Sequence, residues 1–108
     1  MSWLRRNLSR KAAVKQQGLT NAAAAYLAAL DSLAVGADTW GLDAVPAIAG
    51  DKLFYGHVEL LIKAAIYILE TMDTGPLVRA GVTEFMFVLG QPRIRGAVQA
   101  QFNPVAMW

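Results

Sequence analysis

The stretch from Lys52 to about Met72 constrains the fold most, because its polar side chains gather on one narrow stripe of a helical wheel. This stripe contains Lys52, Glu59, Lys63, Glu70 and Asp73. The broad opposite face contains Phe54, Val58, Leu61, Ile62, Ala65, Ile68, Leu69 and Met72. Asp51 is a suitable N-terminal cap, and Gly75-Pro76 follows the last turn. We therefore predict a helix over residues 52–72, buried on most of its circumference in a small bundle or an oligomer.

A second helix is predicted over residues 20–36, where Thr20 and Asn21 can cap the first turn. Its apolar positions follow a heptad, formed by Leu19, Ala23, Tyr26, Leu30, Leu33 and Ala37. Alanines flank this seam and allow another helix to approach closely. The seam fits a core-facing helix of the same chain, or an intermolecular coiled coil, although it covers fewer than the three to four heptads typical of one.

The last third of the chain supports two interpretations. Val82 to Leu89 is rich in β-branched and aromatic residues, Gly90-Gln91-Pro92 supplies turn residues, and apolar residues alternate from Arg93 to Phe102. This pattern favours a β-hairpin near residues 82–102. A four-residue spacing of Leu77, Gly81, Phe85 and Leu89 supports instead a helix near residues 76–89.

These patterns predict a mainly α fold. We expect one small domain of residues 1–108, built as a helical bundle with helices near residues 3–16, 20–36 and 52–72 and a C-terminal hairpin near 82–102. The alternative is an all-α fold with a fourth helix near residues 76–89. Residues 1–17 would form a basic N-terminal arm.

The composition indicates a surface that meets a partner. Hydrophobic residues make up 56% of the chain and charged residues 17%, where about 25% charged is ordinary. A domain of this size buries only about 60–70% of its unfolded surface. Some apolar side chains should therefore face another chain or a lipid, and the residues we expect there are Leu19, Tyr26, Leu30, Leu33, Phe102, Met107 and Trp108.

Charge is distributed unevenly along the chain. Residues 1–30 contain five bases and no acid, whereas residues 31–108 contain five bases and eight acids. The five bases of the arm are Arg5, Arg6, Arg10, Lys11 and Lys15. Such an arm can bind nucleic acid, an anionic membrane surface, or the acids of a neighbouring subunit.

The first 37 residues imitate a targeting segment, but we expect neither a cleaved signal peptide nor a transmembrane span. Asp31 interrupts the apolar region, and the uncharged run over residues 16–30 is shorter than the ~18–20 apolar residues that a spanning helix needs. The protein could be associated with a particle or with a membrane surface.

The residues give little support for catalysis. The chain has no cysteine, and its one histidine, His57, falls on the apolar face of the predicted helix, so we expect it to be structural. Glu59 and Lys63 fit a helical i, i+4 pair. The acids Asp31, Asp38, Asp43 and Asp51 lack the spacing of a calcium loop and are expected to be solvated caps or loop residues. We expect no catalytic residue, metal or cofactor.

The first hypothesis is therefore a non-enzymatic structural or assembly subunit, which packs as a homo-oligomer or in a larger complex such as a virion-type particle. A membrane-associated accessory protein is the first alternative. A nucleic-acid-binding module that uses the basic arm is the second.

Overall fold

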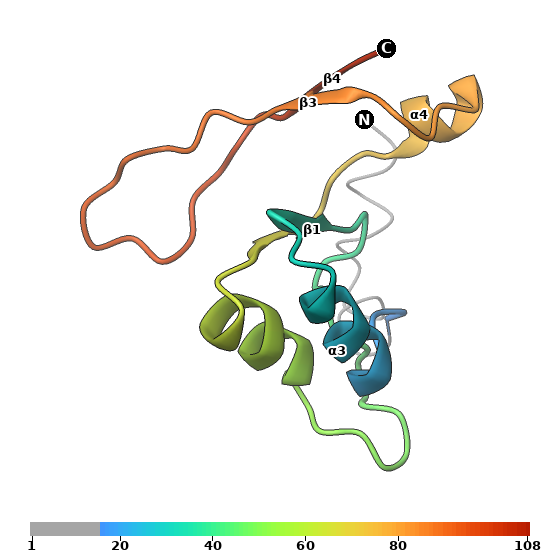
Figure 1. Cartoon of the computed structure of the whole chain (residues 1–108), viewed down its shortest axis with the longest axis vertical. Coiled ribbons are helices and arrows are strands. Elements are labelled where there is room, and N and C mark those ends of the chain that lie inside the picture. The colour runs from blue at the N-terminus through green and yellow to red at the C-terminus, as the bar shows by residue number, and fades with distance from the viewer. Residues whose placement is uncertain (1–15) are drawn as a thin grey trace. The chain divides into compact units, whose positions relative to one another are not determined.

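The computed structural model describes residues 16–108, and the chain divides into two compact units (Figure 1). The first unit ends at Thr74, and the second extends from Gly75 to Trp108. Within the described residues there are three helices and four short strands. The prediction of a mainly α fold is therefore wrong, and the structure is mixed α and β. The helix expected near residues 3–16 lies outside the described residues, apart from Gln16.

The helix α3, Asn21–Ala29, opens the first unit. The Thr20 hydroxyl caps it, as predicted, by accepting a hydrogen bond from the Ala23 N–H at 3.1 Å. The Asn21 N–H donates to Oδ2 of Asp51 at 3.0 Å. The helix is shorter than the predicted 20–36, because the chain turns at Asp31, where φ is 52°. Aspartate is one of the few residues besides glycine that adopt this left-handed conformation.

The helix predicted over residues 52–72 is also wrong, because the segment divides into a helix and a strand. The helix is a π-helix, η1, His57–Lys63, and the strand is β2, Tyr67–Leu69. Ala65, with φ of 55°, separates the two, and the Ile66 N–H donates back to the Leu60 carbonyl at 2.9 Å. The expected apolar face depended on the 3.6-residue period of an α-helix, and the wider π-helical turn changes which side chains face the core.

Strand β2 forms a two-stranded parallel sheet with β1, Ala34–Gly36. The register places Ala34 opposite Tyr67 and Gly36 opposite Leu69. Both strands lie in segments that were predicted to be helical, over residues 20–36 and 52–72, and both are extended instead. Two isolated bridges, Leu19 with Asp43 and Gln16 with Val45, join the start of the described chain to the loop before η1.

The core of the first unit is small and centred on Leu60, which is fully buried at 0% exposure. Helices α3 and η1 lie side by side next to the sheet (Figure 1). Leu42 and Ile66 complete the buried cluster, and Leu19, Leu27 and Val35 pack against it. Residues expected on the buried face of the predicted helix over residues 52–72 lie on the surface instead, namely Phe54, Val58, Leu61 and Ile62.

The second unit begins with a short helix, α4, Gly75–Ala80, which ends at Gly81 with φ of 65°. Strand β3, Met86–Val88, then pairs in antiparallel fashion with β4, Val105–Met107. The register places Met86 opposite Met107 and Val88 opposite Val105. We call this pair the β3–β4 ribbon and the connection over residues 89–104 the ribbon loop.

The hairpin predicted over residues 82–102 is wrong in its second strand. The alternating run is interrupted by a turn, in which the Ala97 N–H donates to the Ile94 carbonyl at 3.2 Å and Gly96 has φ of 80°. A left-handed residue such as Gly96 cannot continue an extended strand. β3 pairs instead with the segment beyond the run. The alternative helix near residues 76–89 is limited to α4.

Candidate functional site

Asp43 is a buried carboxylate in a loop that several hydrogen bonds fix in place. Its residue exposure is only 5%. The side-chain amide of Gln16 donates to the carbonyls of Gly41 and Asp43 at 3.0 and 3.1 Å. The Leu19 N–H donates to the carbonyl of Leu42 at 2.8 Å. The loop therefore holds the carboxylate beneath the start of η1.

This carboxylate caps η1 and also binds its first side chain. Oδ1 of Asp43 accepts from the Gly56 N–H at 2.7 Å, and Oδ2 accepts from the His57 N–H at 3.2 Å. Nδ1 of His57 lies 2.5 Å from the same Oδ2. Asp43 thus accepts hydrogen bonds from backbone N–H groups that the start of a helix leaves without partners. These bonds offset the cost of burying the carboxylate. Asp51, the predicted cap of this segment, caps α3 instead.

Glu70 approaches the other side of the His57 ring. Its Oε1 lies 3.3 Å from Nε2 of His57 and accepts from the Leu42 N–H at 2.7 Å. A neutral imidazole has only one N–H, whereas both ring nitrogens here face carboxylate oxygens. The Asp43–His57–Glu70 cluster thus connects the loop, the start of η1 and the end of β2.

The geometry of the cluster suits a structural cross-link better than a reaction centre. A carboxylate at Nδ1 orients a histidine in acid–base sites, and there Nε2 must be able to reach the reacting group. Here Nε2 faces Glu70. Within residues 16–108, no group of three or more His, Cys, Asp or Glu side chains is arranged to hold a metal ion.

Sequence reasoning missed this cluster. It placed His57 on the helix face opposite Glu70 and expected Asp43 to be solvated, but the structure brings all three together. The helix ends before Ala65 and the chain continues as β2, so Glu70 follows a strand and lies next to His57. A helical wheel drawn for one continuous helix could not indicate this. Asp43 and His57 are also far apart in sequence, so no local spacing identified them as partners.

The predicted Glu59 and Lys63 pair is confirmed on η1, with Nζ of Lys63 2.8 Å from Oε2 of Glu59. The hydrogen bond from Lys63 lowers the pKa of Glu59 below its ordinary value. The same bond raises the pKa of Lys63. The Lys63 side chain is exposed, so the pair contributes little to stability.

The residues expected to contact partners lie in different places. The basic arm, Arg5, Arg6, Arg10, Lys11 and Lys15, lies outside the described residues. Leu19 packs against the core of the first unit. Tyr26, Leu30 and Leu33 are exposed, and Leu33 reaches 82%. The other expected residues, Phe102, Met107 and Trp108, belong to the second unit, where Phe102 is partly buried and Met107 and Trp108 are exposed.

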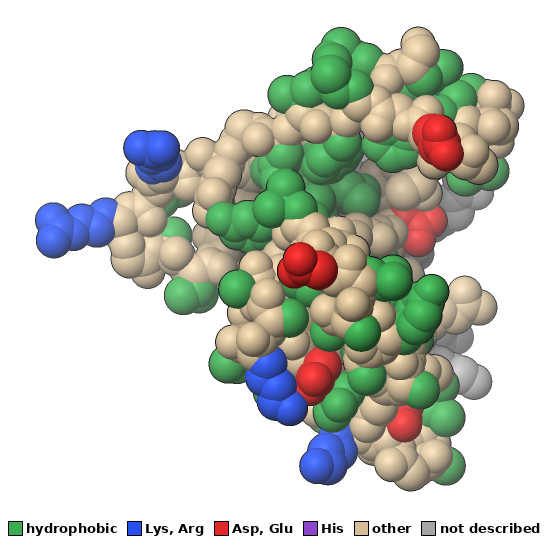
Figure 2. All heavy atoms as spheres, viewed as in Figure 1, with side chains coloured by type: hydrophobic (Ala, Val, Ile, Leu, Met, Phe, Trp, Pro, Cys, Tyr) green, Lys and Arg blue, Asp and Glu red, His purple; other side chains and the backbone are tan. Residues whose placement is uncertain are grey.

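No residue of the second unit is buried. Figure 2 shows hydrophobic side chains on the surface of the β3–β4 ribbon, and Lys or Arg side chains toward the tip of its loop. Phe85 and Phe87 contact each other edge to face, with ring centroids 6.3 Å apart. The unit thus presents apolar side chains that its own structure does not cover.

No protein-family model matches this sequence, and no significant similarity links it to a curated protein or a solved structure. The functional argument therefore depends on the surfaces and contacts of the chain itself. No helix within residues 16–108 is long and apolar enough to cross a bilayer.

Proposed function

We propose that the protein is an assembly subunit, which contributes its second unit to a multi-chain complex. One observation carries this proposal: the unit has no buried residue, yet it is rich in large apolar side chains. The exposed ones are Val78, Phe85, Met86, Phe87, Val88, Ile94, Val98, Val105, Met107 and Trp108.

The ribbon is too small to be stable through its own contacts. Each strand has three residues, and an isolated two-stranded hairpin is at best marginally stable in water. Phe87 and its neighbours Met86 and Val88 point to opposite faces of the ribbon, yet all three are exposed. A partner that covers either face would remove apolar surface from water, which contributes about 25 cal/mol per Å².

The first unit offers an apolar surface as well. Tyr26 lies on α3, Leu30 is the C-terminal cap of this helix one turn later, and Leu33 follows three residues beyond the cap. These three residues, which we call the α3 patch, are all exposed. Large exposed apolar surfaces commonly mark sites of protein association.

Hydrogen exchange of the full chain tests the proposal. We expect the amides of β3 and β4 to exchange rapidly in dilute, monomeric protein and slowly in the assembled complex, while the core amides of the first unit are protected in both. If the ribbon amides of the monomer were protected as strongly as those near Leu60, the ribbon would be stable by itself and the proposal would be wrong.

A further inference from the structure

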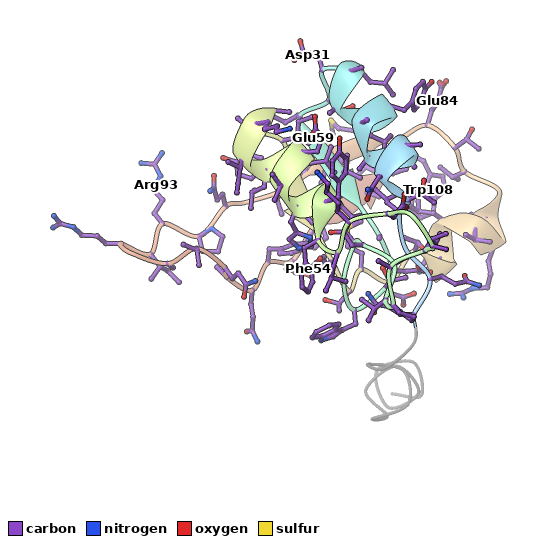
Figure 3. All side chains as sticks on the ribbon, turned by 90° about the horizontal axis from the view of Figure 1, so that it is seen from below. Asp31, Phe54, Glu59, Glu84, Arg93 and Trp108 are labelled. Carbon is purple, nitrogen blue, oxygen red and sulfur yellow. The ribbon has the colours of Figure 1, made fainter. Side chains whose placement is uncertain are left out.

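Asp31 lies beside an apolar surface, and no side chain within residues 16–108 is its partner. It lies at the end of α3 and points away from the first unit (Figure 3). Among the described residues its carboxylate makes no ion pair or side-chain hydrogen bond. Its neighbours Leu30 and Leu33 belong to the exposed α3 patch. A carboxylate in this position can select a partner that combines apolar contacts with a positive charge.

The ribbon loop has the complementary character. Arg93 and Arg95 are exposed and, within the part of the chain that the structure describes, neither has an ion pair. Arg93 projects from the loop into solvent (Figure 3). Ile94 stands between the two arginines in the sequence and begins the turn that ends at Ala97. Val98 follows this turn and is 97% exposed.

We propose that the ribbon loop of one copy docks on the α3 patch of a second copy of this chain. Arg93 and Arg95 would pair with Asp31, while Ile94 and Val98 would contact Leu30 and Leu33. This inference rests on the proposed function, because it names the partner of an assembly subunit.

The charges of the two units favour a second copy as the partner. Residues 16–74 contain two bases and seven acids, whereas residues 75–108 contain three bases and one acid. Opposite charges attract a loop of one copy to the first unit of another, and like charges disfavour loop against loop. The contact joins two different surfaces, so two copies can exchange it reciprocally in a two-fold dimer, or it can repeat from copy to copy as a ring or a filament.

Charge reversal with rescue tests the contact. The masses of full-length variants would be measured by light scattering at tens of micromolar protein. We expect Arg93→Glu with Arg95→Glu, and separately Asp31→Lys, to lower the apparent association constant roughly fivefold or more, because each variant places like charges together. Arg79→Glu is the matched control, since Arg79 is an exposed arginine of the same unit outside the loop. Its association should fall far less than that of the loop variant, because Arg79 lies outside the proposed contact.

The triple variant, Asp31→Lys with Arg93→Glu and Arg95→Glu, decides between the proposed pairing and misfolding. It restores opposite charges, so its association should return toward the wild-type value, which a folding defect would not allow. The proposed contact would be overturned if the triple variant associated no better than the variants reversed on one side only, or if those reversals had no effect. A wild-type monomer would overturn the second copy as partner. If the ribbon amides of that monomer exchanged rapidly, the assembly function would still stand.

Discussion

Nδ1 of His57 lies 2.5 Å from Oδ2 of Asp43, and the same carboxylate caps the helix that His57 begins. One buried acid thus serves a backbone terminus and a side chain together. Its removal would leave the Gly56 N–H and the His57 ring without their acceptor.

Asp43→Asn should therefore destabilise the first unit by about 2–4 kcal/mol, because the amide keeps one acceptor and turns a donor toward other donors. Urea unfolding followed by circular dichroism measures this loss. Asp38→Asn is the control, since Asp38 is exposed and should change stability by less than about 0.5 kcal/mol. Equal midpoints for the two variants would contradict the structural role of Asp43.

Gly18→Ala should destabilise the first unit by about 1–3 kcal/mol through a steric clash. A Cβ at position 18 would lie 2.3 Å from the carbonyl carbon of Asp43. The obstacle is backbone, so a side-chain rotation cannot relieve it. At Gly90 a Cβ would meet nothing within 4 Å, so Gly90→Ala is the matched control. Thermal unfolding of both variants tests the close approach of the two segments.

Leu60→Ala should cost about 2–5 kcal/mol, because it opens a cavity in the centre of a small core. Leu53, which is exposed, provides the control Leu53→Ala. Denaturant unfolding of the two variants tests whether Leu60 lies at the centre of the core. A near-neutral Leu60→Ala would contradict the core described above.

Lys63→Met should raise the pKa of Glu59 toward its ordinary value, since the hydrogen bond from Lys63 lowers it. The stabilisation from a carboxylate with a depressed pKa is present above its unfolded-state pKa and is lost as the pH falls through the folded-state pKa. The folding free energy of the wild type should therefore approach that of Lys63→Met in acid. An NMR titration of the Glu59 side chain follows the shift directly, and an unchanged pKa would show that the pair is not formed in solution.

Local signals in the sequence predicted local features well. Thr20 caps α3 through its own hydroxyl, and Glu59 and Lys63 meet because they are four residues apart. Features that depend on distant segments were missed. Alanine rarely adopts a left-handed conformation, so the sequence did not indicate that the chain turns at Ala65 after η1. Strand β3 pairs with a segment beyond the alternating run that resembled a strand.

The candidate surfaces were predictable only in part. An apolar excess in a short chain correctly indicates that some apolar residues are exposed, and Tyr26, Leu30 and Leu33 are among them. The wheel of residues 52–72 could not show that Leu61 and Ile62 are exposed too, because it presupposed an α-helical period. The pairing of Asp43 with His57 follows from the route of the loop, which no spacing encodes.

The bridges and strand pairs of the first unit join segments that are distant in the chain, such as Leu19 with Asp43 and Ala34 with Tyr67. Contacts of this kind form only after long loops have closed. Loop closure costs conformational entropy, which slows folding. The buried cluster joins Leu42 to Leu60 and Ile66, so it is complete only when the loop and η1 have come together. We therefore expect the unit to fold in one cooperative step. The ribbon loop of a neighbouring copy would then meet either a folded unit with a complete α3 patch or an unfolded chain without one.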